Sequence, residues 1–139
     1  MIAGIAHFAI NTKDMEKTMD FYIRALGCKK AFSIPHPETK APWIEYVQAG
    51  TQLLEFFYDA TEENPFRKSL IGFNHLGLQV YDVYALVKRI EEAGYTMDTQ
   101  PKEDREFNHK AWLKDPNGIR IELMQIDIRS PHGPYKIKE

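Results

Sequence analysis

The chain has 139 residues, of which 43% are apolar and 27% charged, with a formal net charge of −2. This length suits one compact domain with a hydrophobic core and is too short for two ordinary domains. No apolar run is long enough to span a bilayer, and no basic stripe marks a surface that would bind nucleic acid. The N-terminus lacks the pattern of a secretory signal, and the single cysteine, Cys28, cannot form an internal disulfide. We therefore expect a cytoplasmic globular protein that binds neither membranes nor nucleic acid.

One sequence pattern occurs twice in the chain. Gly4-Ile5-Ala6-His7 is matched by Gly72-Phe73-Asn74-His75, and each histidine is followed seven residues later by an aspartate, Asp14 and Asp82. Apolar residues then recur at helical spacing, which predicts a helix capped by each aspartate. The apolar positions are Met15, Met19, Tyr22, Ile23 and Leu26 in the first run, and Val83, Leu86, Val87 and Ile90 in the second.

The remaining segments have the alternation and the turn residues of strands. A glycine ends each predicted helix, at Gly27 and Gly94, and Asp115-Pro116-Asn117-Gly118 predicts a tight hairpin turn. We expect strands at 5–11, 28–34, 43–48 and 53–58, and again at 73–80, 95–98, 110–114 and 119–125. The prediction is one α+β domain over 1–139, with βαβββ modules at about 1–60 and 72–127, a linker at 61–71 and a loose tail at 128–139.

Each module also carries a histidine and a glutamate in matching positions. Glu55 follows His7 by 48 residues, and Glu122 follows His75 by 47. Both glutamates stand among apolar strand residues, where an unpaired carboxylate would cost several kcal/mol. Two imidazoles and two carboxylates can fill four positions of an octahedral first-row metal site and leave two for water or substrate. Open positions are typical of catalytic rather than structural ions.

Less specific interpretations exist for each of these residues taken alone. A single strand histidine is more often a hydrogen-bonded core residue, and a single inward glutamate more often pairs with Arg or Lys, for which Arg120 is a candidate. The coincidence of four repeat-related residues favours the metal site. The other histidines, His36, His109 and His132, lie in predicted turns or polar loops, where we expect solvated roles.

These motifs closely resemble the vicinal oxygen chelate superfamily, which contains glyoxalases, bleomycin resistance proteins and dioxygenases. The resemblance extends to about Gln125. It rests on His7-Phe8-Ala9-Ile10 before Asp14, Phe21-Tyr22, Leu26-Gly27, Leu54-Glu55-Phe56, His75-Leu76-Gly77-Leu78, and Lys114-Asp115-Pro116-Asn117-Gly118 leading into Ile121-Glu122-Leu123. It implies a cup-shaped, eight-stranded mixed sheet made of paired βαβββ modules, with the helices outside.

Within the superfamily, the ligand types are similar to those of lactoylglutathione lyase (glyoxalase I), which uses His, Glu, His and Glu. The resemblance implies that His7, Glu55, His75 and Glu122 hold one divalent metal ion per site, nickel or zinc first, with cobalt, manganese and iron as alternatives. It implies an enediolate stabilised by the metal, with Glu122 as the base and Glu55 acting on the opposite face. It also implies a homodimer, although the site could form within one chain or across two.

The substrate is less well defined by the resemblance. Where the glyoxalases carry an Arg and an Asn that hold glutathione, this chain has Asn11 and Asp59. The polar segment Lys102 to His109 could be a lid, with Arg105 and Lys110 as anion contacts, or a solvated loop. The alternatives are an enzyme like methylmalonyl-CoA epimerase or a fosfomycin-resistance enzyme, and a non-catalytic protein that binds bleomycin-like molecules.

Overall fold

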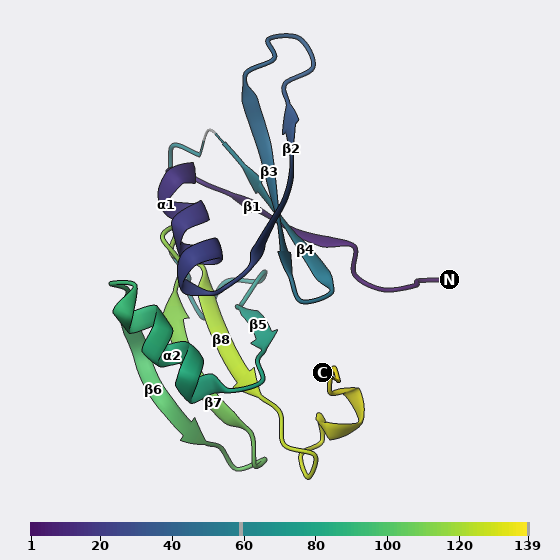
Figure 1. Ribbon diagram of the computed structural model, residues 1–139, viewed down its shortest axis with the longest axis vertical. Coiled ribbons are helices and arrows are strands. Elements are labelled where there is room, and N and C mark those ends of the chain that lie inside the picture. Colours follow the sequence, from purple (N-terminus) through teal and green to yellow (C-terminus); the bar gives the residue numbers. More distant parts are fainter. Residues whose placement is uncertain (59, 139) are drawn as a thin grey trace. The chain divides into compact units, whose positions relative to one another are not determined.

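The computed structural model describes residues 1–58 and 60–138, which form two compact units, Met1–Asn64 and Pro65–Glu139. Each unit contains one βαβββ module (Figure 1), so the predicted α+β class and the paired modules are confirmed. The first module consists of β1 (His7–Asn11), α1 (Met15–Met19), a π-helix η1 (Asp20–Ala25), β2 (Lys29–Pro35), β3 (Pro42–Ala49) and β4 (Gln52–Phe57). The second consists of β5 (Leu76–Gln79), α2 (Val83–Glu92), β6 (Met97–Glu103), β7 (His109–Lys114) and β8 (Arg120–Gln125), and is followed by a 3-10 turn η2 (Gly133–Tyr135).

The two sheets have the same topology. The strand order is β1-β4-β3-β2 in the first unit and β5-β8-β7-β6 in the second. In each sheet the first and last strands of the module pair in parallel, and the other pairs are antiparallel. The predicted eight strands therefore form two four-stranded mixed sheets. Among the described residues, no helix combines the length and apolar character needed to cross a membrane.

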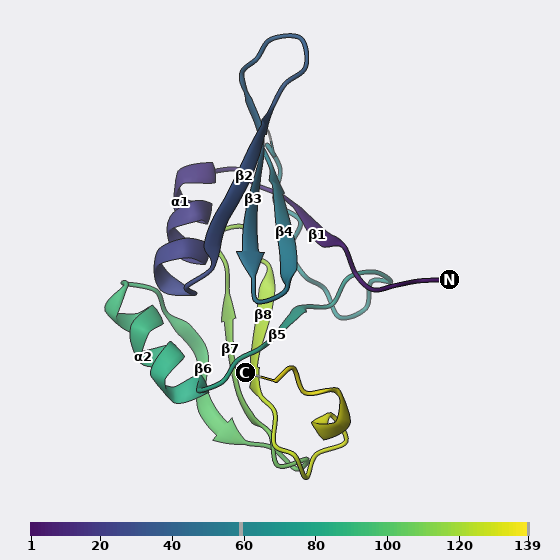
Figure 2. The ribbon, with the colours of Figure 1, turned by 45° about the vertical axis from the view of Figure 1, so that its right-hand side comes forward.

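Each helix packs on one face of its own sheet (Figures 1 and 2). In the second unit, Val83, Val87 and Ile90 of α2 are fully or almost fully buried, as are Ile121 and Leu123 of β8. Because side chains alternate along a strand, Glu122 lies on the sheet face opposite α2. In the first unit the Tyr22 ring packs on Phe56, with ring centroids 4.7 Å apart, so Glu55 likewise lies opposite its helix.

The first helix differs from the prediction in its second half. Asp14 caps it as expected by accepting the Lys17 amide, but from Asp20 the backbone is a π-helix. Phe21 and Tyr22, both in this segment, are fully buried. Thr18 is also fully buried, because its hydroxyl bonds to Thr12 and to the Asp14 carbonyl. Of the predicted stripe, Met15 and Tyr22 are buried, whereas Met19, Ile23 and Leu26 are each only half-buried.

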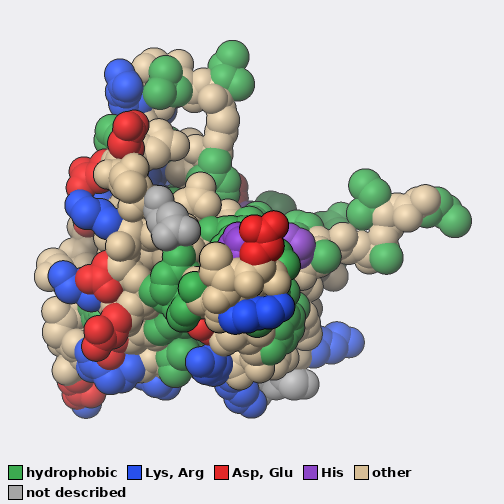
Figure 3. All heavy atoms as spheres, turned by 90° about the horizontal axis from the view of Figure 1, so that it is seen from above, with side chains coloured by type: hydrophobic (Ala, Val, Ile, Leu, Met, Phe, Trp, Pro, Cys, Tyr) green, Lys and Arg blue, Asp and Glu red, His purple; other side chains and the backbone are tan. Residues whose placement is uncertain are grey.

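Two further segments differ from their predictions. Lys102 and Glu103 belong to β6 and His109 begins β7, so only residues 104–108 form the connecting turn, and the predicted lid is largely a hairpin. The tail is not loose, because the Gln79 amide bonds to both the N–H and the C=O of Ile137. The segment before β1 is extended and exposes Met1, Ile2 and Ile5 (Figures 1 and 3).

Candidate metal centre

The first half-site consists of His7 and Glu55. His7 begins β1, and Ala9, two residues later, is the register partner of Glu55 on the parallel strand β4. This register brings His7 Nε2 to 3.2 Å from Glu55 Oε2. The Glu55 side chain is 9% exposed and the His7 side chain 45%. The carboxylate is thus largely withdrawn from solvent, while the imidazole remains accessible.

Tyr46 also belongs to this half-site, although no sequence pattern pointed to it. It lies opposite Glu55 in the antiparallel register of β3 and β4. Its hydroxyl donates a short hydrogen bond to Glu55 Oε1, and this bond, with burial and the charge of Glu55, raises the pKa of Tyr46. The two oxygens of Glu55 therefore face different partners. The turn signal at Ala49-Gly50 indicates that β3 and β4 pair, but it does not show that the Tyr46 hydroxyl reaches Glu55.

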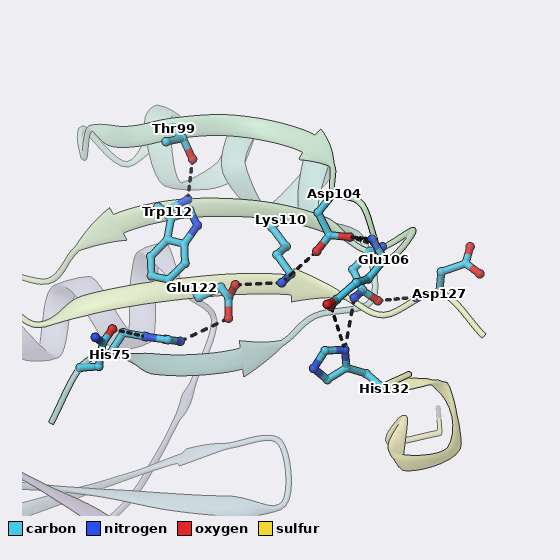
Figure 4. Close-up of polar contacts among 11 residues, drawn as sticks. His75, Thr99, Asp104, Glu106, Lys110, Trp112, Glu122, Asp127 and His132 are labelled. Atoms are coloured by element: carbon cyan, nitrogen blue, oxygen red, sulfur yellow. Dashed lines mark hydrogen bonds and ion pairs between the residues drawn. The ribbon is translucent and has the colours of Figure 1, made fainter. Parts of the chain in front are cut away.

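The second half-site repeats this geometry with His75 and Glu122 (Figure 4). His75 directly precedes β5, and Gly77 is the parallel partner of Glu122 on β8. His75 Nε2 lies 3.4 Å from Glu122 Oε2, and the Glu122 side chain is 10% exposed. A Cβ atom at Gly77 would stand 3.7 Å from Glu122 Oε2, an ordinary van der Waals distance. Trp112, opposite Glu122 on β7, packs edge-on against the His75 ring.

Lys110 contacts the other oxygen of Glu122. Its Nζ lies 3.3 Å from Glu122 Oε1 and 2.9 Å from Asp104 Oδ2 (Figure 4). Burial opposes the charged form of each group, but the hydrogen bond between them raises the pKa of Lys110, helped by Glu122. The same bond, with two backbone amides, lowers the pKa of Asp104. The ion-pair partner of Glu122 is therefore Lys110, whereas Arg120 donates to Asn74.

The remaining predicted contact residues lie in less defined surroundings. Asn11 is exposed at the end of β1, and Arg105 is exposed in the turn between β6 and β7. Asp59 lies outside the described residues. Lys110 is on a strand, in contact with two carboxylates, instead of on a mobile lid. The histidine predicted to be solvated in a loop, His109, is half-buried on β7 and contacts the Tyr84 hydroxyl at 2.9 Å.

The donor atoms fit a divalent first-row cation. Two ligands at right angles, each about 2.1 Å from such an ion, are about 3 Å apart, close to the 3.2 and 3.4 Å between nitrogen and oxygen in the two half-sites. Each pair supplies only two ligands. Within either unit, the described residues contain no group of three or more His, Cys, Asp or Glu placed to hold a metal ion. That the two pairs share one ion stays a prediction.

Comparisons with known proteins agree with this architecture. The family model of the Glyoxalase/Bleomycin resistance protein/Dioxygenase superfamily matches residues 4–123. The chain therefore belongs to this superfamily. It is 26% identical to a lactoylglutathione lyase of Pseudomonas putida, over 86% of this chain and 83% of that protein.

Solved structures show the same fold. A glyoxalase family protein from Enterococcus faecalis superposes with a TM-score of 0.73 at 25% identity, covering 88% of this chain and 98% of that one. The fosfomycin resistance protein FosX from Listeria monocytogenes, in a complex with Mn(II) and sulfate, superposes with a TM-score of 0.70 at 16% identity, covering 94% and 98%. At this identity the second similarity concerns the fold alone.

Proposed function

We propose that the chain is a divalent-metal-dependent lyase or isomerase of the glyoxalase type, acting on a small substrate with vicinal oxygens. The observation that carries this proposal is the repeated His–Glu pair. In both half-sites an imidazole nitrogen and a buried carboxylate oxygen face each other at 3.2 and 3.4 Å, a separation suited to neighbouring ligands of one cation. His7, Glu55, His75 and Glu122 would then hold the ion together.

The proposed reaction divides the work between the ion and the protein. A bound cation would polarise the substrate oxygens and stabilise the negative charge of an enediolate. Glu122 takes the α-proton as general base, and Glu55 acts on the opposite face of the substrate. Tyr46 and Lys110 each contact the Oε1 atom of one glutamate. Each carboxylate is therefore held at one oxygen and keeps the other, Oε2, directed at its histidine.

For the substrate and for the metal we propose several candidates each. A hemithioacetal is the first substrate to test, because lactoylglutathione lyases are among the relatives. Asn11 provides no cation for an anionic thiol carrier, so thiols other than glutathione belong in the screen. Methylmalonyl-CoA and fosfomycin with a thiol test the alternative enzymes. We propose nickel or zinc as the metal, with cobalt, manganese and iron as alternatives, and a homodimer as the assembly.

The decisive experiment is metal reconstitution followed by an activity screen. Chelator-treated protein should take up a divalent metal and gain activity on at least one of these substrates. Protein that neither retains nor rebinds nickel, zinc, cobalt, manganese or iron would refute the enzyme and favour a binding protein.

With the metal and substrate that give activity in this screen, Glu122→Gln should lower turnover by at least about two orders of magnitude, the effect expected for loss of a general base. The circular dichroism spectrum should stay unchanged. Glu92→Gln is the matched control, because it makes the same chemical change on the exposed surface of α2, beside Lys88. Full turnover in Glu122→Gln would remove Glu122 from the role of base.

A further inference from the structure

The side chain of Asn74 connects the candidate ligand His75 to an arginine on another strand. Asn74 Oδ1 lies 2.7 Å from His75 Nδ1 and 3.1 Å from Nη1 of Arg120, the first residue of β8. Asn74 and His75 are adjacent in the chain, whereas Arg120 is 46 positions from Asn74. The sheet pairing of β5 with β8 is what brings them together.

Arg120 contacts two aromatic rings. Its guanidinium carbon lies 4.3 Å from the centroid of the Phe66 ring and 5.0 Å from that of Trp112. Trp112 in turn packs against the His75 ring, with centroids 4.9 Å apart. Aromatic faces attract a guanidinium, and its planar donors are rigidly arranged. The donor to Asn74 is therefore anchored independently of Asn74 itself.

The chemistry of these three side chains determines where the imidazole proton lies. Arginine can only donate hydrogen bonds, so the Asn74 atom that faces it must be the amide oxygen. An amide oxygen only accepts, so His75 Nδ1 must carry a proton to bond with it. In the neutral imidazole the other nitrogen, Nε2, then carries the lone pair. That nitrogen is the one directed at Glu122 Oε2, at 3.4 Å.

We propose that Arg120 and Asn74 are positioning residues that hold His75 as the Nδ1–H tautomer and present its Nε2 lone pair to a cation. Neutral Nε2 and a carboxylate oxygen are both acceptors, so they cannot bond to each other directly and need a cation, a further proton or a bridging donor. That the partner is a divalent metal rests on the function proposed above; the tautomer does not. The first half-site has Ala6 where the second has Asn74, so this device belongs to His75.

The tautomer is tested on metal-free protein by nitrogen NMR of the histidine rings. The spectra are recorded at a pH of about 8.5, where histidine in model peptides is neutral. Wild-type His75 should show a protonated Nδ1 and an unprotonated Nε2. Asn74→Ala should lose this preference, and Asn74→Asp, which still offers an accepting oxygen, should keep it. A wild-type His75 protonated on Nε2 would overturn the proposal.

The consequence for binding is tested by competition for zinc against a chromophoric chelator. Loss of a group that orients a metal-bound histidine typically weakens binding about 10- to 100-fold, and we expect this in Asn74→Ala and Arg120→Met. Asn74→Asp should bind at least as tightly as wild type. Lys114→Met is the control for Arg120→Met, because it removes the same charge from the residue paired with Arg120 on β7.

The outcomes separate the two proposals. If Arg120→Met fails to fold for lack of packing on Phe66 and Trp112, the Asn74 pair still decides, since that side chain is exposed. Unchanged zinc affinity in Asn74→Ala would overturn the positioning role. A wild-type protein that binds no zinc, nickel, cobalt, manganese or iron would refute the proposed function, while the NMR result would still decide the tautomer.

Discussion

At the scale of single residues, Asp104 contributes stability through the partners of its carboxylate. Its Oδ1 accepts the amides of Glu106 and Asn108, and its Oδ2 contacts Lys110. These bonds favour the ionised form in the folded protein and lower the pKa of Asp104. The unfolded state therefore binds more protons than the folded state as the pH falls below the ordinary value of 3.8.

Asp104→Asn should consequently destabilise the protein by about 1.5–3 kcal/mol at neutral pH, the range for hydrogen bonds to charged groups. The difference from wild type should shrink as the pH falls below 3.8, because wild-type Asp104 then becomes protonated too. Urea unfolding at a series of pH values measures it. Asp98→Asn, which changes an exposed carboxylate on β6, the strand before Asp104, is the control. A difference that persists in acid would show that the charge of Asp104 is not its cause.

The four candidate ligands stand out in the sequence, but the contacts that Tyr46 and Lys110 make with the two glutamates do not. His7, Glu55, His75 and Glu122 are marked by the repeat, since a duplicated module places equivalent residues at equivalent distances. The repeat does not point to Tyr46 and Lys110, because their side chains differ in chemistry: one is a phenol and the other an ammonium. They reach equivalent oxygens from β3 and β7. Their contacts depend on cross-strand register and side-chain length, which sequence periodicity does not contain.

At the scale of elements, the end of the chain is attached to the β6–β7 turn. Asn108 is fully buried, its Oδ1 accepts the Asp127 amide, and its Nδ2 contacts His132. The Arg129 guanidinium lies over the Phe107 ring at 4.6 Å. Composition suggested a loose tail because Pro131, Gly133 and Pro134 disfavour regular structure, yet side chains distant in sequence anchor it.

Replacing Gly133 by alanine adds one methyl group, and we expect this to disturb the attachment of the tail to the β6–β7 turn. A Cβ atom there would stand 2.4 Å from the Ile128 carbonyl oxygen, so the backbone would have to move. We expect Gly133→Ala to cost about 1–3 kcal/mol, as overpacking does, or to detach the tail and speed amide exchange after residue 127. Gly4→Ala, where a Cβ meets nothing within 4 Å, is the control. Wild-type stability and exchange in Gly133→Ala would contradict this packing.

The two helices differ in how well periodicity predicted them. In α2 the buried residues Val83, Val87 and Ile90 follow the predicted spacing, because the helix is regular and one face meets the sheet. In the first helix a polar residue, Thr18, is buried where the predicted stripe has none. Its hydroxyl is satisfied inside the core, which an apolar pattern cannot show.

At the scale of the whole molecule, each unit carries one candidate His–Glu pair. A His–Glu pair supplies two ligands, whereas catalytic metal sites generally take three or more from the protein. The duplicated chain thus offers two incomplete sites or one complete one. If the pairs complete one site, within a chain or between two chains, the stoichiometry is one ion per chain. Separate sites would give two weakly bound ions.

A shared ion would therefore couple the two units in binding and in unfolding. We expect one zinc per chain by titration, and His7→Ala and His75→Ala should each abolish tight binding. Zinc at 100 times its dissociation constant should stabilise the folded state by about 2.7 kcal/mol.

Trp43 and Trp112 lie one in each unit, so Trp112→Phe and Trp43→Phe leave a single fluorophore to report on each. With zinc, both reporters should unfold at the same urea concentration, because release of the ion by either unit removes ligands from the other. Two zinc ions per chain, or a zinc-bound unit that unfolds alone, would mean that each pair binds separately.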